Sequence, residues 1–485
     1  MAGGLAAACS GGASGGPPTG YAPPSESGPE ASTPVADAGS HTGADSADGG
    51  GGSKPPSEAG SPPLDAPRPD TSSSIPPPID AGADVPPPRG PTPAANGTNF
   101  PFPQNRPSAS CIYPARYLNS DVQAAYAKWT TDTVTSSGAN GFLRIQRLSS
   151  DQGAPAGSTV SEGIGYGMLI AVYMGDQMLF DQLWQYEQTN LDMNGLMNWN
   201  IGSDGKTVLG MGAATDADED MAFALVLASK QWGGQGSLSK SYADLAAAQI
   251  KAIWANEIDN YQLILPGDTW AKSTSAVNVS YFAPAYYKVF ATVDPPGGSA
   301  GDAWMSAVDE SYTVLQASLN SANGNTSNGL VPAWCSASGQ PNAGAFGAGQ
   351  SSPTNYQYDS CRTPFRIGLD WCWNAEPRAK TYVGLTSAFF AGIGAKNVVD
   401  GYSLNGTPDP GTNPNSTATQ SAAFLGPAAV GAMSSSAYQS FVNEAYGEIA
   451  TLQLLQGGTY YEDSWTTLSL LMMTANFLDY TAITP

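Results

Sequence analysis

Histidine is almost absent from this 485-residue sequence, and the single one, His41, lies in a Gly/Pro/Ser-rich stretch near the start. A globular part without histidine has no Ser-His-Asp triad, no Cys-His dyad and no histidine-ligated zinc site. Carboxylates, tyrosine, lysine or arginine must therefore carry any acid–base chemistry.

Charged residues are also few, and most of them are acidic. Only 12% of the residues are charged, and 41 Asp and Glu against 19 Lys and Arg give a net charge of −22. This balance disfavours nucleic acid and anionic membranes as partners. No apolar run reaches the roughly 18 residues that cross a membrane. The abundance of neutral polar residues is typical of secreted proteins.

The first 98 residues differ from the rest in composition. Residues 10–98 are mostly Gly, Pro, Ser, Ala, Thr and Asp, while all 11 Trp follow residue 98. Such a segment buries too little apolar surface to offset its ordering entropy, so we expect a disordered linker. Residues 99–485 are long enough for one large core. We therefore expect a linker, residues 10–98, followed by a single large domain, residues 99–485.

Residues 1–9 resemble the remnant of a secretion signal. Cys9 follows Leu5–Ala8, which approximates a bacterial lipoprotein cleavage site, although a basic and longer hydrophobic leader is missing. Either the start is truncated or the similarity is a coincidence. We expect an extracellular or cell-surface location, with Cys9 as a candidate lipid anchor, and a monomeric chain.

The other four cysteines are Cys111, Cys335, Cys361 and Cys372. Two disulfides among them could connect in three ways, and the sequence does not choose. If Cys361 and Cys372 shared one straight helix, they would lie about 16 Å apart and could not pair.

Helical periodicity dominates after Asn99, and strand signals are sparse apart from a turn at Asp204-Gly205. Twelve helices in this length indicate an all-α fold of six helical hairpins. A ring of hairpins would bury one set of helices and leave the long loops on one face. The expected helices are 117–135, 162–174, 177–190, 216–232, 239–257, 281–292, 301–320, 362–374, 377–395, 419–432, 435–454 and 464–476.

Four acids crowd the start of one of these helices, in the segment Ala213–Trp232. We expect Thr215 as its N-cap, with Asp218 completing a capping box. First-turn acids can simply complement the helix dipole, or they can line a site. A calcium loop does not fit, because Met221 and Leu227 stand where its Gly and Glu should be.

Two further motifs offer carboxylates. In SEGIGYGM (Ser161–Met168), Ser161 is expected as a helix N-cap directly before Glu162, and three glycines allow close approach of a backbone or a ligand. In YDSCRTPFR (Tyr358–Arg366), Asp359 precedes a helix and Arg362 follows it. Asp359 is either a capping residue or a base that Arg362 holds ionised.

Aromatic residues stand in polar loops around these motifs: Trp199, Trp270, Tyr281 and the pair Tyr460-Tyr461. Such rings more often belong to a core, but in Gly/Asn/Asp-rich loops they can stack on the apolar faces of sugars. GSDGKT (Gly202–Thr207) lacks the glycine spacing of a phosphate loop and is interpreted as a turn. Carboxylates without histidine, together with loop aromatics, indicate glycoside hydrolysis.

The motifs SEGIGYGM, NGLMNW, ATDADEDMAFALVLASKQW, PGDTW, SYFAPAYYKV and YDSCRTPFRIGLDW occur in this order, and over residues 105–480 the chain resembles glycoside hydrolase family 8. The resemblance implies an (α/α)6 barrel, an inverting mechanism and no cofactor or metal. Its cellulase-like branch cleaves internal β-1,4 bonds of glucans.

The same resemblance assigns roles to residues. It implies that Glu162 is the general acid, that Asp359 is the base, and that Asp216 holds the sugar at the cleavage subsite. It implies that the substrate is also bound by Trp199, Trp270, Tyr281, Tyr358, Arg362 and Tyr461. Asp218 is then expected to be structural, and Glu219 and Asp220 to serve packing or solvent.

Three functions stay open at this point. The first is an endo-β-1,4-glucanase. The second is the same machinery acting on xylan, chitosan or mixed-linkage β-glucan. The third is a catalytically silent glucan-binding protein of the cell surface. For the enzyme, a raised pKa of Glu162 and a separation of about 6.5–9.5 Å from Asp359 are expected.

Overall fold

The structure is a computed structural model that describes residues 97–148, 155–269, 276–293, 302–342, 354–409, 418–455 and 459–485. The expected signal remnant, nearly all of the expected linker, Cys9 and His41 lie outside these residues.

Twelve α-helices occur in the described part, one at each of the twelve expected places. They are α1 (Asn119–Thr133), α2 (Ser161–Met174), α3 (Gln177–Glu187), α4 (Thr215–Gln231), α5 (Tyr242–Asn256), α6 (Pro284–Val293), α7 (Asp302–Ala317), α8 (Thr363–Asn374), α9 (Pro377–Ile393), α10 (Ala422–Ala432), α11 (Gln439–Leu455) and α12 (Tyr460–Met473).

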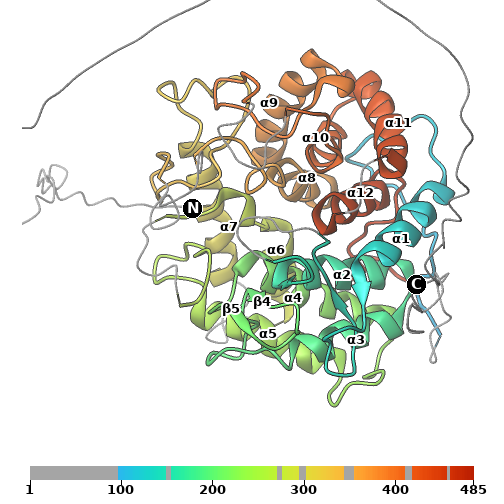
Figure 1. Cartoon of the computed structure of the whole chain (residues 1–485). Helices are drawn as coiled ribbons and strands as arrows, with labels where there is room; N and C mark the ends of the chain where they lie inside the picture. The colour runs from blue at the N-terminus through green and yellow to red at the C-terminus, as the bar shows by residue number, and fades with distance from the viewer. Residues whose placement is uncertain are drawn as a thin grey trace, which may run out of the picture. The chain divides into compact units, whose positions relative to one another are not determined.

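The even-numbered helices form a closed inner ring. Each packs against the next, from α2 through α4, α6, α8 and α10 to α12, and α12 packs back on α2. The odd-numbered helices surround them, as Figure 1 shows. This is the expected (α/α)6 barrel. The hairpins are α2–α3, α4–α5, α6–α7, α8–α9 and α10–α11, and the first helix, α1, packs on the last, α12.

Sequence composition explains which helices lie inside. In α10 the run AAFLGPAAVGA is buried at every position, and α2 is buried at nearly every position. Glycine allows the inner helices to approach closely: a Cβ on Gly165 of α2 would lie 3.1 Å from the carbonyl oxygen of Ala217 of α4. The three glycines each cost about 1 kcal/mol in helix propensity, which this packing must offset. The close approach that these glycines allow is therefore used by neighbouring parts of the protein.

Short strands support the loops at one end of the ring. β3 (Thr159–Val160), β4 (Asn200–Ile201) and β5 (Val208–Gly210) form an antiparallel sheet, and β1 (Val134–Thr135) pairs with β2 (Arg144–Ile145). The turn between β4 and β5 contains Asp204 and Gly205, and the Asp204 carboxylate accepts the backbone N–H of Thr207. The interpretation of Gly202–Thr207 as a turn is confirmed.

Two expected helix caps are wrong. α4 begins at Thr215 and α2 at Ser161, and neither helix has a side-chain cap hydrogen bond at its start. The Thr215 hydroxyl donates instead to the carbonyl oxygen of Leu265, 2.6 Å away. A hydroxyl committed to a loop carbonyl in this way anchors the loop rather than capping the helix.

Within the residues that the structure describes, one disulfide joins Cys111 to Cys372, 261 residues apart in the chain. It ties the segment before α1 to the C-terminal turn of α8. Cys335 and Cys361 are buried free thiols. Among the helices described, none is long and apolar enough to cross a membrane.

Candidate active site

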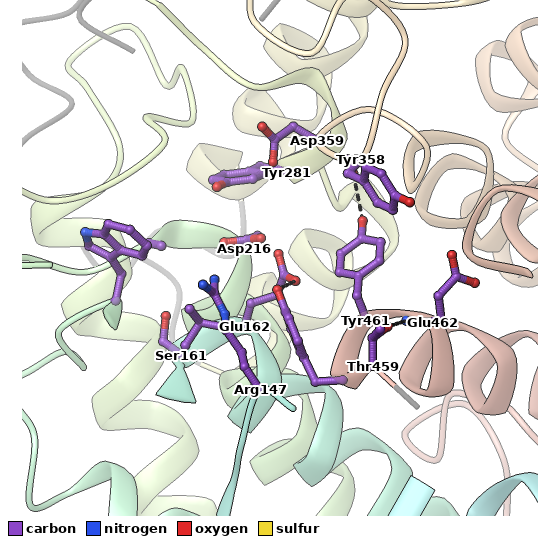
Figure 2. A pocket seen from close by; sticks show the side chains of 14 residues that line it. Arg147, Ser161, Glu162, Asp216, Tyr281, Tyr358, Asp359, Thr459, Tyr461 and Glu462 are labelled. Atoms are coloured by element: carbon purple, nitrogen blue, oxygen red, sulfur yellow. Dashed lines mark hydrogen bonds between the residues drawn. The ribbon is translucent and has the colours of Figure 1, made fainter. Parts of the chain in front are cut away.

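A pocket of about 270 Å³ opens where the inner helices begin. Its walls come from the first turns of α2, α4 and α12 and from the loops that precede α6 and α8, which Figure 2 shows from close by. The N-termini of α2, α4 and α12 lie at the pocket, so the positive ends of their helix dipoles point toward it. Such a position stabilises the negative charge of a carboxylate. The lining residues are Arg147, Val160, Ser161, Glu162, Trp199, Ala214, Asp216, Tyr281, Tyr358, Asp359, Thr459, Tyr460, Tyr461 and Glu462.

The three carboxylates singled out by sequence, Glu162, Asp216 and Asp359, all line this one pocket. Glu162 and Asp216 are the second residues of α2 and α4, and a single atom joins them. Arg362 Nη1 lies 2.5 Å from Glu162 Oε2 and 2.5 Å from Asp216 Oδ2. The Arg362 side chain is fully buried beneath the pocket. Its positive charge therefore interacts with the carboxyl groups of Glu162 and Asp216 without screening by water.

Asp359 has different neighbours from those expected. In the described residues the ion pairs of Arg362 are with Glu162 and Asp216, which corrects the expectation that Arg362 holds Asp359 ionised. Asp359 Oδ2 instead accepts hydrogen bonds from Trp334 Nε1 at 3.2 Å and Gln357 Nε2 at 3.3 Å. The sequence spacing put Asp359 and Arg362 close, but the turn before α8 aims the two side chains differently.

The pKa of Glu162 is raised to about 8. Burial is the largest cause, the Arg362 charge opposes it, and the nearby Asp216 adds to it. The Tyr460 hydroxyl also donates to Glu162 Oε1 at 3.2 Å. A carboxyl in this environment keeps its proton near neutral pH, and the pKa is raised as expected for Glu162.

The remaining acids at the start of α4 face the protein interior. Asp218 accepts a hydrogen bond from Gln249 Nε2, and its carboxyl belongs to the barrel wall, in line with the structural role expected for it. Glu219 accepts one from the Tyr287 hydroxyl at 2.6 Å, and Asp220 forms an ion pair with Arg366 at 2.9 Å. All three are buried, so a solvent-facing role for Glu219 or Asp220 is wrong.

Aromatic rings form much of the rest of the pocket wall. The expected Trp199, Tyr281, Tyr358 and Tyr461 all line it, and Trp270 lies outside the described residues. Trp199 rests on Gly210 of β5, where a Cβ would come within 2.2 Å of the indole ring. The Tyr461 hydroxyl donates to the carbonyl oxygen of Tyr358 at 2.7 Å, as Figure 2 shows.

Sequence reasoning missed several residues of this site, among them Trp334, Tyr460 and Arg147. Trp334 reaches Asp359 from a loop 25 residues earlier in the chain. Tyr460 was noticed beside Tyr461 but was not assigned to the site. Arg147 lines the pocket and lies 5.5 Å from the centre of the Tyr460 ring. No motif marks Trp334 or Arg147, because only folding brings their loops to the pocket.

Metal-binding geometry does not occur in the described part of the chain, where no group of three or more His, Cys, Asp and Glu could hold an ion.

Known proteins with related sequences share this architecture. The family model for glycosyl hydrolases family 8 matches residues 104–475. Endoglucanase A of Acetivibrio thermocellus is 37% identical over 73% of this chain and 69% of its own, and Endoglucanase C of Ruminiclostridium cellulolyticum is 36% identical over 79% and 78%. The apo structure of a β-1,3-1,4-glucanase from Paenibacillus sp. X4 superposes with a TM-score of 0.69 at 30% identity, covering 78% of this chain and 99% of that one. A cold-adapted family 8 xylanase has the same fold at a TM-score of 0.62 and 23% identity. With the barrel and its carboxylate-lined pocket, these matches place the chain in glycosyl hydrolase family 8.

Proposed function

We propose that this protein is an endo-acting glycosidase that hydrolyses internal β-1,4 bonds of cellulose-type glucans with inversion at the anomeric carbon. The observation that carries the proposal is the pairing, in one pocket, of a carboxyl with a raised pKa, Glu162, and a second carboxylate, Asp359. Two carboxyls on opposite sides of a glycosidic bond are the minimum apparatus for this reaction.

Glu162 is the proposed general acid. Its proton goes to the glycosidic oxygen as the bond from that oxygen to the anomeric carbon breaks. Burial and Asp216 keep the proton on Glu162 at working pH, and Arg362 and Tyr460 hold the carboxyl in place. Arg362 also stabilises the carboxylate that remains once the proton has left.

Asp359 is the proposed base. It accepts a proton from a water molecule, and the oxygen of that water bonds to the anomeric carbon from the face opposite the leaving group. An α product then forms from a β bond. The separation of about 6.5–9.5 Å between Glu162 and Asp359 remains a prediction of this mechanism.

Asp216 is the proposed partner of the sugar at the point of cleavage, where a negative charge beside the anomeric carbon stabilises an oxocarbenium-like transition state. The rings of Trp199, Tyr281, Tyr358 and Tyr461 on the pocket wall suit stacking on sugars. Trp270 is also proposed to bind the substrate. Arg362 was expected to do so as well, but its side chain is fully buried and does not line the pocket, so we propose that it acts through its contacts with Glu162 and Asp216.

The stereochemistry can be followed directly. Proton NMR of the products released from cellohexaose should show the α anomer first, with the β anomer appearing only through mutarotation. An initial β product would contradict inversion.

The nature of the polymer needs a separate comparison. The curated relatives at 36–37% identity carry the name endoglucanase, whereas the solved relative at 30% identity is a β-1,3-1,4-glucanase. Reducing-sugar release from carboxymethylcellulose, barley β-glucan, xylan and chitosan separates these substrates. We expect the highest kcat/KM on the β-1,4-glucan. Binding without release of any product would support a silent glucan-binding protein instead.

We also propose an extracellular or cell-surface location for a monomeric protein. The disulfide between Cys111 and Cys372 supports an oxidising compartment. Lipid attachment at Cys9 is testable by metabolic labelling with a fatty acid, compared between the parent chain and Cys9→Ala.

A further inference from the structure

In the part of the chain that the structure describes, side-chain hydrogen bonds hold one oxygen of the Asp359 carboxylate, Oδ2. Both hydrogen bonds that it accepts within the described residues end on Oδ2, one from Trp334 Nε1 and one from Gln357 Nε2. Its other oxygen, Oδ1, has no such contact there. The two oxygens of this carboxylate therefore differ in their contacts, because the hydrogen bonds from Trp334 and Gln357 both end on Oδ2. Asp359 itself lines the pocket.

Trp334 is itself fixed in place. Its side chain is only 5% exposed, and the ring meets Tyr281 edge-on with 6.2 Å between ring centres. On either side of it, the backbone N–H of Ala333 donates to the carbonyl of Asn355, and Cys335 pairs with Val277 through two backbone hydrogen bonds. An indole N–H held in this way is a preorganised donor rather than a mobile one.

Gln357 contacts the same residue twice. Its Nε2 donates to Asp359 Oδ2, and its Oε1 accepts the backbone N–H of Asp359 at 3.1 Å. The Ser280 hydroxyl donates to the Asp359 carbonyl oxygen at 2.5 Å and accepts from Arg362 Nε at 3.1 Å. The backbone and one carboxylate oxygen of Asp359 are therefore both anchored.

We propose that Trp334 and Gln357 are positioning residues for the catalytic base. They hold Oδ2 of Asp359 so that Oδ1 is the oxygen that takes the proton from the attacking water. This inference rests on the proposed function, because it takes Asp359 as the base.

The test removes one donor and keeps the ring. Trp334→Phe deletes the N–H, and Gln357→Leu deletes the second donor. Trp371→Phe is the matched control, because Trp371 donates its indole N–H to the carbonyl of Ser110 at 2.8 Å from the last turns of α8 and does not line the pocket. Circular dichroism and thermal melts establish that each variant is folded. kcat and KM on cellohexaose are measured from pH 4 to 10.

Trp334→Phe should lower kcat roughly tenfold, the value of one hydrogen bond to a charged group, and leave KM within about twofold. Trp371→Phe should change neither kcat nor KM. A Trp334→Phe enzyme with the parent's kcat overturns the proposal. If Trp334→Phe does not fold, Gln357→Leu decides by the same criteria.

A double-mutant cycle with Asp359→Asn distinguishes loss of the positioning of Asp359 from a general structural effect of the substitution. In the Asn background, Trp334→Phe should cost almost nothing further, because the base it positions is already gone. An equal fractional loss in both backgrounds would assign Trp334 a purely structural role. If Asp359→Asn alone retains full activity, the proposed function loses its base; if it is inactive while Trp334→Phe is normal, only the positioning role fails.

Discussion

Arg362 Nη1 lies 2.5 Å from Glu162 Oε2, so the proposed acid is in direct contact with a fully buried cation. A neighbouring cation normally favours the ionised form of a carboxyl, yet the pKa of Glu162 is raised. Burial, the largest cause, outweighs the Arg362 charge, part of which is also satisfied by Asp216. The site therefore keeps an acid protonated and has a cation ready for the carboxylate that forms on proton transfer.

Glu162→Gln should abolish most of the activity. The amide is similar in size but has no proton to transfer at the glycosidic oxygen, so kcat on cellohexaose should fall by about two to four orders of magnitude. KM should change little. The loss should be much smaller on a dinitrophenyl cello-oligosaccharide, whose leaving group needs no proton. An equal loss on both substrates would contradict the role of Glu162 as acid.

The pH profile should have a basic limb set by Glu162. With its pKa raised to about 8, the carboxyl is protonated and active below that pH and loses its proton above it. kcat/KM should therefore fall as the pH rises through about 8. Asp216→Asn removes a negative charge beside Glu162, so the limb should move to lower pH in any residual activity. A basic limb near pH 5 in the parent enzyme would disprove the raised pKa.

Glu187→Gln should flatten the dependence of stability on pH. Burial raises the pKa of Glu187 to about 8, against a hydrogen bond from Gln188 that lowers it. The folded state thus binds a proton that the unfolded chain has released above its ordinary pKa of 4.5. Stability is full below that value and declines as the pH rises toward about 8, by at most about 1.4 kcal/mol per pH unit.

The free energy of unfolding from urea titrations at pH 5, 6.5 and 8 measures this slope. Glu444→Gln, at an exposed position of α11, is the control and should keep the parent slope. An unchanged slope in Glu187→Gln would show that Glu187 is ionised in the folded protein.

Gly210→Ala should weaken substrate binding while leaving the three pocket carboxylates Glu162, Asp216 and Asp359 unchanged. The added Cβ would lie 2.2 Å from the Trp199 ring and must displace it from the pocket wall. Loss of one sugar–aromatic contact should raise KM up to about tenfold and leave kcat nearly unchanged. Gly447→Ala on α11 is the control, since its Cβ meets no atom within 4 Å. A parent-like KM for Gly210→Ala would remove Trp199 from the binding surface.

Cys111→Ala should destabilise the barrel by about 2–5 kcal/mol, because the disulfide to Cys372 closes a loop of 261 residues in the unfolded chain. Thermal melts with and without reductant measure the effect. Peptide mapping after alkylation of the unreduced, denatured protein should label Cys335 and Cys361 but not Cys111 or Cys372. Label on Cys372 would contradict this pairing.

Much of the fold was readable from local pattern. All twelve helices of the described chain lie where helix-like segments were expected. Several of these segments have a clear 3.6-residue apolar period, a local pattern that depends on near neighbours in the sequence. Errors fell at the helix starts. The hydroxyl of Thr215 bonds a loop carbonyl 50 residues away, and a contact of that separation leaves no mark on the local sequence.

The sequence by itself determined which residue types are available for the proposed chemistry: a globular part without histidine, with Glu162, Asp216 and Asp359 in recognisable motifs. Only the tertiary structure decided how these groups act on one another. It joined Glu162 to Asp216 through Arg362, assigned Trp334 to Asp359, and buried Glu162 enough to raise its pKa. The electrostatic environment of a group depends on distances and burial that are set when six helices pack into a ring, and residues up to 298 positions apart meet there.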